Sequence, residues 1–132
     1  VWQYRTGDLP AERWGAETTP LKIGDTVYLC SARNILIALD ASTGKERWRY
    51  DPKIADDAIP YTAACRGVAH FATTGTQACA NRIIEGTLDA RLIAVDAKTG
   101  LPCTSTRHAV WVLWQQVWCR SLLRQPLCAA SS

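Results

Sequence analysis

Cysteine is the residue type that most directly suggests chemistry in this chain. The 132 residues include six, namely Cys30, Cys65, Cys79, Cys103, Cys119 and Cys128. No two of them have the two-residue spacing of a zinc knuckle or a thioredoxin motif, so the sequence does not indicate metal binding by cysteine. One or two disulfides in an oxidising compartment are favoured, and a Cys65–Cys79 bridge closing a loop of roughly 15 residues is one candidate pairing. Buried free thiols that act as small hydrophobic side chains are the alternative.

Two aspartates, Asp40 and Asp96, begin two copies of the motif Asp-x-x-Thr-Gly. An aspartate in such a turn accepts hydrogen bonds from backbone N–H groups two or three residues further on, and the glycine supplies the positive φ that tightens the loop. We therefore predict that both acids are structural, with a catalytic role as the alternative. The isolated His70 and His108 are also predicted to be structural, because lone histidines more often are.

The elements that carry these turns form a repeat. Residues 37–45 recur as residues 93–101, 56 positions later, and each copy ends a run of alternating or β-branched apolar residues before it turns. Internal similarity at a fixed period indicates repeated structural units. Apolar alternation followed by a glycine-containing turn predicts a β-hairpin in each unit.

Further strands are predicted on both sides of the turns. Residues 26–30 and 82–86 precede the two copies, and residues 46–50 follow the first with aromatic side chains on one face and arginines on the other. Short antiparallel meanders of this kind stack radially as propeller blades, whose usual repeat is about 40 to 50 residues. We predict an all-β fold, a partial β-propeller of one to two antiparallel blades. Residues 52–61 then form an inserted loop, where function often lies.

The chain changes character after residue 103. Residues 104–132 contain no acid and no glycine, and three of the six tryptophans crowd there on one helical stripe. An amphipathic helix and an unstructured tail are both consistent with this segment. We therefore expect a propeller part at residues 1–103 and an atypical tail at 104–132. The change at residue 104 favours a truncated or frameshifted reading of a longer gene, with a divergent natural terminus as the alternative.

Composition and charge exclude several classes of protein. With 48% hydrophobic and 20% charged residues, the chain is expected to be globular rather than disordered or collagenous. No apolar run approaches the roughly 20 residues of a membrane-spanning helix, and the N-terminal residues lack the plan of a signal peptide. The net charge of +3 comes from the tail, while residues 1–103 are balanced, so nucleic-acid binding is not indicated.

Several motifs in the chain resemble those of one enzyme family. They are Trp-x-x-Arg-Thr-Gly-Asp at residues 2–8, Glu-Thr-Thr-Pro at 17–20, Ala-x-Asp-x-x-Thr-Gly-x-x-x-Trp at 38–48 and Cys-Arg-Gly-Val at 65–68. In this order the segments resemble the pyrroloquinoline quinone (PQQ)-dependent dehydrogenases, and in particular the membrane-bound glucose dehydrogenase branch. The resemblance implies an eight-bladed propeller of which this chain holds fewer than two complete blades.

The resemblance also implies which residues bind the cofactor. Arg66 matches an arginine beside the quinone, and a guanidinium is a suitable fork for the carboxylates of PQQ. A surface ion pair of Arg66 with Asp56 or Asp57 is the alternative. Glu17 matches a glutamate that hydrogen-bonds the cofactor; without the resemblance it would be an ordinary loop carboxylate.

Two neighbouring positions bear on the substrate. Alcohol-oxidising members of the family usually have two adjacent cysteines over the quinone, but this sequence has Ala64-Cys65, which resembles the sugar and polyol branch. Thr62 stands where glucose-oxidising relatives have a histidine, so glucose, quinate, another polyol and an aldose all remain open. Both Cys65 and Thr62 are expected near the cofactor.

The family's tryptophan-docking motif implies a structural role for Trp48. Its indole is expected to pack on Ala38 and on the Gly44 turn of the adjacent blade, because a large aromatic beside small residues closes such an interface. In the second copy of the motif, Thr104 stands where the indole would be.

The resemblance finally implies PQQ as cofactor and a divalent cation, calcium or magnesium, whose ligands this chain does not supply. The general base also comes from later blades, so the chain alone is not expected to turn over substrate. A sugar or polyol would be oxidised at the periplasmic face of the bacterial inner membrane, with electrons passed to ubiquinone and membrane contact only through segments absent here. The alternative is a non-catalytic propeller scaffold, such as the outer-membrane assembly lipoproteins.

Overall fold

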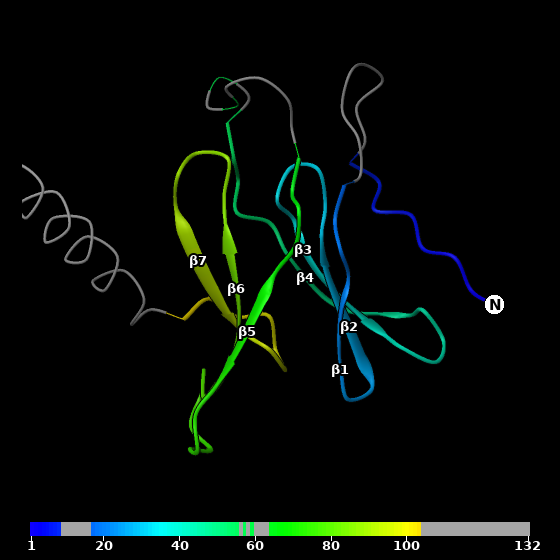
Figure 1. The fold of residues 1–132 in the computed structure, drawn as a ribbon, viewed down its shortest axis with the longest axis vertical. Helices are drawn as coiled ribbons and strands as arrows, with labels where there is room; N and C mark the ends of the chain where they lie inside the picture. The colour runs from blue at the N-terminus through cyan, green and yellow to red at the C-terminus, as the bar shows by residue number, and fades with distance from the viewer. Residues whose placement is uncertain (9–16, 56, 58, 60–63, 104–132) are drawn as a thin grey trace, which may run out of the picture.

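Seven strands form two antiparallel sheets that lie side by side (Figure 1). The computed structural model describes residues 1–8, 17–55, 57, 59 and 64–103. The strands are β1 (Leu21–Ile23), β2 (Thr26–Cys30), β3 (Leu36–Asp40), β4 (Glu46–Tyr50), β5 (Ala69–Ala72), β6 (Asn81–Gly86) and β7 (Leu92–Asp96). The first sheet has the order β1-β2-β3-β4 and the second the order β5-β6-β7. The predicted all-β class and the two antiparallel blades are confirmed, and the described residues contain no helix that could cross a membrane.

The repeated turns have the predicted structure. Oδ1 of Asp40 accepts hydrogen bonds from the backbone N–H groups of Ser42 and Thr43 at 3.0 Å, and Asp96 does the same for the two corresponding residues of its copy. These bonds satisfy donors that the tight turn would otherwise leave unpaired. Arg47 also reaches Asp40, at 2.7 Å, and this hydrogen bond is the main reason that the pKa of the Asp40 carboxyl lies below its usual range. The structural role predicted for the two acids is confirmed.

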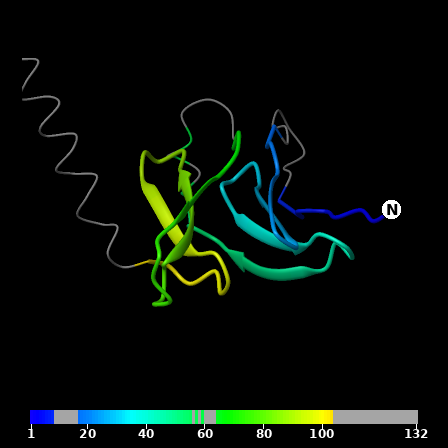
Figure 2. The same ribbon diagram turned by 60° about the horizontal axis from the view of Figure 1, so that its bottom comes forward.

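The main core lies between the two sheets. Tyr28, Leu36 and Ala38 from the first sheet and Ile83 and Val95 from the second belong to one cluster of buried side chains. Figure 2 shows the two sheets facing each other across this region. Because each sheet is too small to enclose a core alone, burial of apolar surface between them is the main stabilising interaction of the described residues.

Chain direction places the loops at two ends. Because neighbouring strands are antiparallel, five segments lie at one end, here called the upper end: residues 17–20, 31–35, 51–55, 64–68 and 87–91. Two contacts join the sheets there. The backbone N–H of Leu88 donates to Oδ1 of Asn34 at 3.0 Å, and Arg91 donates to the carbonyl of Pro52 at 2.8 Å. In Figure 1 these segments are at the top.

A tryptophan joins the sheets at the opposite end. Nε1 of Trp48 on β4 donates to the carbonyl oxygen of Ala97 at 3.0 Å, and the hydroxyl of Tyr28 donates to the same oxygen at 3.0 Å. A Cβ added at Gly100 would lie 2.7 Å from the Trp48 ring, so the indole lies directly on the turn of the second sheet. Only glycine leaves room for this approach, and its φ of +72° also favours glycine.

The N-terminal segment repeats this contact one unit earlier. Nε1 of Trp2 donates to the carbonyl of Ala41 at 3.1 Å, and the ring of Trp2 covers Gly44. The expectation that Trp48 docks on Gly44 is therefore wrong: Ala38 is its cross-strand neighbour within the same sheet, and its docking partner lies on the next sheet. A tryptophan that ends one unit covers the turn of the following unit.

Two disulfides connect segments far apart in the sequence. Cys30 is bonded to Cys65, and Cys79 is bonded to Cys103. The candidate pairing of Cys65 with Cys79 is therefore wrong. Cys65 precedes β5 at the upper end, whereas Cys79 lies in the loop between β5 and β6 at the lower end. Closeness along the chain did not decide the pairing, because the strand between the two cysteines separates them.

Some sequence-based expectations fall on residues that the structure does not describe. These are the tail at 104–132 with its helical stripe and His108, part of the inserted loop at 52–61, and Thr62.

Replacing Trp48 by alanine should lower the free energy of unfolding by about 2–3 kcal/mol, because it removes a half-buried indole from the junction of the sheets. Trp48→Phe should keep most of the packing and lose about 1 kcal/mol with the hydrogen bond to Ala97. Urea denaturation followed by circular dichroism measures both. Trp2→Ala is the control, with a smaller expected loss because Trp2 lies at the exposed N-terminal edge. Equal losses for Trp2→Ala and Trp48→Ala would contradict the central position of Trp48.

Candidate functional site

Two segments at the upper end run side by side and carry the charged residues singled out in the sequence. The backbone N–H of Thr19 donates to the carbonyl of Arg66 at 3.0 Å, and Thr19 and Gly67 form a parallel β-bridge. Neither segment belongs to a regular strand. The bridge holds Glu17 and Arg66 on neighbouring pieces of backbone, although 49 residues separate them in the sequence.

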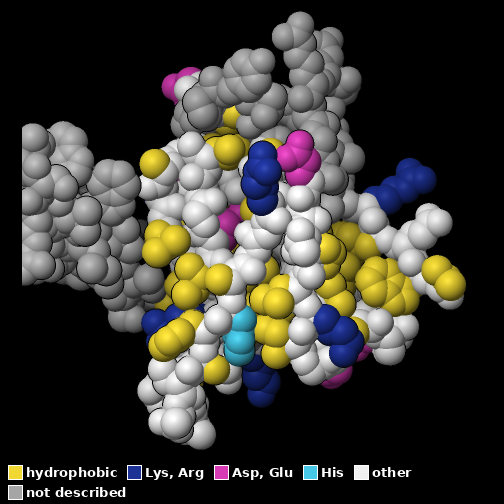
Figure 3. Space-filling model, viewed as in Figure 1, with side chains coloured by type: hydrophobic (Ala, Val, Ile, Leu, Met, Phe, Trp, Pro, Cys, Tyr) yellow, Lys and Arg dark blue, Asp and Glu magenta, His cyan; other side chains and the backbone are white. Residues whose placement is uncertain are grey.

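The side chains of Glu17 and Arg66 meet at the surface. Nη2 of Arg66 lies 3.9 Å from Oε2 of Glu17, and the two side chains are 88% and 56% exposed. An ion pair this long and this exposed contributes little to stability. Its groups are accordingly open to a ligand: the guanidinium offers a planar fork of N–H donors and the carboxylate offers acceptors. In the space-filling view, one basic and one acidic side chain lie side by side in the upper middle of this face, and further charged side chains lie along its lower part (Figure 3).

A disulfide fixes the residue before Arg66. Cys65 is bonded to Cys30 at the end of β2, and both half-cystines are buried. The hydroxyl of Thr18 lies 3.4 Å from the sulfur of Cys30, so the segment with Glu17 contacts the same disulfide. Backbone next to both charged residues is therefore anchored to one covalent bond.

A third acid, Glu85 on β6, was not identified from the sequence. Its side chain is 2% exposed, and Oε1 accepts a hydrogen bond from Nδ2 of Asn34 at 2.8 Å. The same oxygen lies 3.1 Å from the sulfur of Cys65, while Oε2 has no hydrogen-bond partner. Burial raises the pKa of Glu85 to about 8, and the bond from Asn34 offsets part of that effect.

The alternation of β6 could have revealed this residue. Residues two apart on a strand face the same way, so Glu85 shares the face of Ile83, which is completely buried. An acid on the apolar face of a predicted strand is a signal for a buried carboxyl.

Potential metal ligands also meet at this place. In the part of the chain that the structure describes, the sulfurs of Cys30 and Cys65 and a carboxylate oxygen of Glu85 lie within 4.8 Å of one another. A disulfide carries no thiolate, which is the form of cysteine that binds metals. In the oxidised state this group of atoms therefore cannot bind a metal ion through sulfur.

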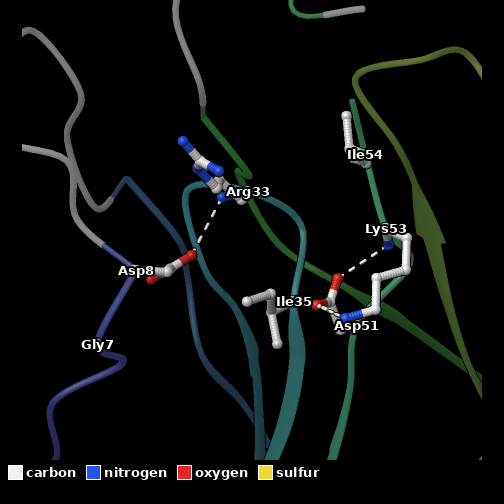
Figure 4. Close-up of a pocket in the computed structure, with 7 residues that line it drawn as sticks. All are labelled: Gly7, Asp8, Arg33, Ile35, Asp51, Lys53 and Ile54. Carbon is white, nitrogen blue, oxygen red and sulfur yellow. Dashed lines mark hydrogen bonds and ion pairs between the residues drawn. The ribbon is translucent and has the colours of Figure 1, made fainter. Parts of the chain in front are cut away.

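Two hollows open at the upper end. One, of about 390 Å³, is bordered by Thr19, Gly67 and Glu85 together with apolar side chains of β1, β5 and β7. The other, of about 540 Å³, lies over the first sheet (Figure 4). Its lining is Gly7, Asp8, Arg33, Ile35, Asp51, Lys53 and Ile54.

The second hollow has a polar lining, and most of its charged groups bind one another. Lys53 binds Asp51 through both its backbone N–H and its ammonium group, each at 2.8 Å. Oδ2 of Asp8 accepts a hydrogen bond from the backbone N–H of Arg33 at 3.3 Å, whereas its Oδ1 is buried without a partner. Such a lining suits a neutral, hydroxyl-rich molecule better than an anion, because both signs of charge are present.

Comparison with known proteins places these features in a family. Residues 1–110 match the family described as "PQQ: Glucose/ethanol/alcohol dehydrogenase, beta-propeller domain". In an alignment of 107 positions that covers 76% of this chain, the sequence is 52% identical to the "Glycerol dehydrogenase large subunit" of Gluconobacter oxydans (strain 621H). In an alignment of 115 positions that covers 78% of this chain, it is 41% identical to the "Quinoprotein glucose dehydrogenase" of Escherichia coli (strain K12).

A solved structure agrees with these relatives. The quinohemoprotein alcohol dehydrogenase from Comamonas testosteroni superimposes with a TM-score of 0.57 and 31% identity, covering 67% of this chain and 12% of that one. The chain spans 14% of the length of each of the two curated relatives above.

Removing the surface pair should leave stability almost unchanged. We expect Arg66→Ala and Glu17→Gln to shift the free energy of unfolding by less than about 0.5 kcal/mol, because exposed ion pairs contribute little. Asn34→Ala is the contrasting variant. It removes two hydrogen bonds between the sheets and should cost about 2–3 kcal/mol. Denaturant titration measures all three, and a large loss for Arg66→Ala would show that Arg66 holds the fold rather than a ligand.

Proposed function

Because the chain belongs to the PQQ-dependent glucose/ethanol/alcohol dehydrogenase family, we propose that its upper end contributes to a PQQ site in an enzyme that oxidises a polyol or sugar. The observation that carries this proposal is the exposed pair of Arg66 and Glu17, held together by backbone bonding and positioned beside a buried disulfide. Nothing in the fold requires this pair, so a ligand-binding role accounts for it better than a structural one.

The residues at the upper end fit the cofactor. PQQ is a flat quinone with three carboxylates, and such a ligand needs a cationic fork beside a surface on which its ring can lie. Arg66 supplies the fork, and its long contact with Glu17 leaves its donors available. The hollow bordered by Thr19 and Gly67 offers apolar surface next to it. When bound, the cofactor supplies an acceptor for the two electrons removed from the alcohol carbon.

Each residue then has a separate task. Arg66 binds a carboxylate of the ligand and neutralises its charge. Glu17 accepts a hydrogen bond from the ligand and keeps the guanidinium oriented when the site is empty. Cys65, through its bond to Cys30, fixes the backbone on which Arg66 stands. Thr62, outside the described residues, remains a candidate for contact with cofactor or substrate.

The names of the relatives support a proposal for the substrate class. Those with the names "Glycerol dehydrogenase large subunit", "Quinoprotein glucose dehydrogenase" and "Quinate/shikimate dehydrogenase (quinone)" share 36% to 52% identity with this chain. We infer a polyhydroxylated substrate, with glycerol or a similar polyol ahead of glucose. Electron transfer to ubiquinone at the periplasmic face of the inner membrane belongs to the same proposal.

Catalysis also needs groups from outside this chain. The calcium or magnesium ion that assists hydride removal, and the general base, are proposed to come from the remaining part of the propeller. The chain alone is therefore expected to hold part of the cofactor site without turning over substrate.

Replacing Arg66 tests the proposal. In a full-length protein that joins this chain to the remaining blades, Arg66→Ala should weaken PQQ binding about 10-fold to 100-fold, because a charged hydrogen bond contributes roughly 1.5–3 kcal/mol. Arg66→Lys should recover part of the loss, since lysine keeps the charge without the fork. Quenching of tryptophan fluorescence by PQQ measures the dissociation constant.

Lys45→Ala is the matched control, because Lys45 is an exposed cation on the β3–β4 turn at the opposite end. The affinity of the Lys45→Ala variant for PQQ should equal that of the unmodified protein. An Arg66→Ala variant with unchanged affinity would remove the main local support for the enzyme and favour a non-catalytic propeller scaffold.

A further inference from the structure

Glu85 is a buried acid that forms no ion pair with any of the residues that the structure describes. Its carboxyl group lies between the two sheets at the upper end, with one oxygen bonded to Asn34 and the other without a partner. Burial of an ionised carboxylate without a cation is costly, so such a group is stable only in its neutral form. A residue of this kind is rarely kept for stability alone.

The contacts of Glu85 connect three pieces of the upper end. Oε1 lies 3.1 Å from the sulfur of Cys65, the residue before Arg66, and 2.8 Å from Nδ2 of Asn34. Asn34 in turn accepts a hydrogen bond from the backbone N–H of Leu88 at 3.0 Å. The carboxyl group therefore stands where the disulfide, the β2–β3 loop and the β6–β7 turn meet.

The charged groups on the neighbouring segments are directed to other partners. Arg66 pairs with Glu17 at the surface, Arg91 pairs with Asp89 at 2.6 Å, and Asp8 accepts the backbone N–H next to Asn34. On the flanking strands, His70 of β5 and Asp96 of β7 lie toward the lower end. The remaining cation nearby is Arg33, whose backbone precedes Asn34 and whose side chain lines the polar hollow.

Building on the proposed function, we propose that Glu85 is a positioning residue of the anion site. As a neutral acid it holds the Cys30–Cys65 disulfide and Asn34 in place, and its ionisation loosens the segment that carries Arg66. The site would then bind an anionic ligand less tightly as the pH rises.

The direction of the effect follows from the burial. Because the pKa of Glu85 is raised to about 8 in the folded chain, the neutral form predominates at pH 7 and the carboxylate at pH 9. The carboxylate needs water or a cation, and among the described residues Oε2 has no hydrogen-bond partner to supply either. Admitting water separates the sheets at the disulfide and loosens the backbone of Cys65, so the next residue, Arg66, holds an anion less firmly.

The disulfide itself reports this loosening without any cofactor. A water-soluble phosphine reduces both disulfides, and the measured quantity is the reduction rate of Cys30–Cys65 divided by that of Cys79–Cys103. We expect this ratio to rise about tenfold between pH 7 and pH 9, in step with the ionised fraction of Glu85. Mass spectrometry of alkylated peptides from the full chain measures both rates. The second disulfide is an internal control, because it cancels the pH dependence of the reagent.

Glu85→Gln separates charge from shape. The amide keeps the size and the contact with Asn34 but cannot ionise, so the ratio of reduction rates should be constant from pH 7 to pH 9. Glu46→Gln, an exposed change on β4, should leave the rise intact. A rise that persists in Glu85→Gln, or its absence in the unmodified chain, would overturn the proposal.

The consequence for ligand binding is measured separately. In the full-length protein, the dissociation constant for PQQ should increase severalfold from pH 7 to pH 9, and Glu85→Gln should abolish the increase while retaining the affinity seen at pH 7. Carboxylates of the ligand are ionised throughout this range, so they do not contribute. If Arg66→Ala leaves PQQ affinity unchanged, the proposed function fails, while the disulfide measurement still decides the role of Glu85.

Discussion

The bond between Cys30 and Cys65 determines how the upper end of the molecule is arranged. It connects the last residue of β2 with a segment that has no strand partner of its own apart from one bridge to Thr19. In the chain-entropy picture, a crosslink over a separation of this size stabilises the fold by about 4 kcal/mol. Its more specific effect is local, since it fixes Arg66, which no core packing would hold.

Around this bond, the structure combines a covalent constraint with a polar group that stability does not explain. The indole of Trp48 and the hydroxyl of Tyr28 already join the sheets at the lower end through one carbonyl oxygen. An apolar side chain in place of Glu85 would pack at the upper junction without an unpaired oxygen. A buried acid with a raised pKa, in contact with the residue before an exposed arginine, is instead a candidate for a functional role.

Much of the fold could be predicted from short stretches of sequence. The Asp-x-x-Thr-Gly turns and the alternation on β4 depend on atoms within a few residues of one another, and both were predicted correctly. The docking of Trp48 was assigned to the wrong turn, because the motif shows that an indole meets a glycine but not on which sheet the glycine lies. The predicted disulfide pairing was wrong for the same reason. The strand β5 separates Cys65 from Cys79, and β2 brings Cys30 next to Cys65.

The sequence by itself determined the strands around the two repeated turns, the turns themselves and the family to which the motifs of Arg66 and Glu17 point, but not β1 or β5. Only the tertiary structure decided that these two side chains lie 3.9 Å apart, that one disulfide anchors the backbone beside both, and that one oxygen of the buried Glu85 has no partner among the described residues. The physical reason is the range of the interactions. Hydrogen bonds in turns and alternation along strands are set by neighbours in sequence, whereas desolvation and ion pairing depend on which surfaces the two sheets bury against each other.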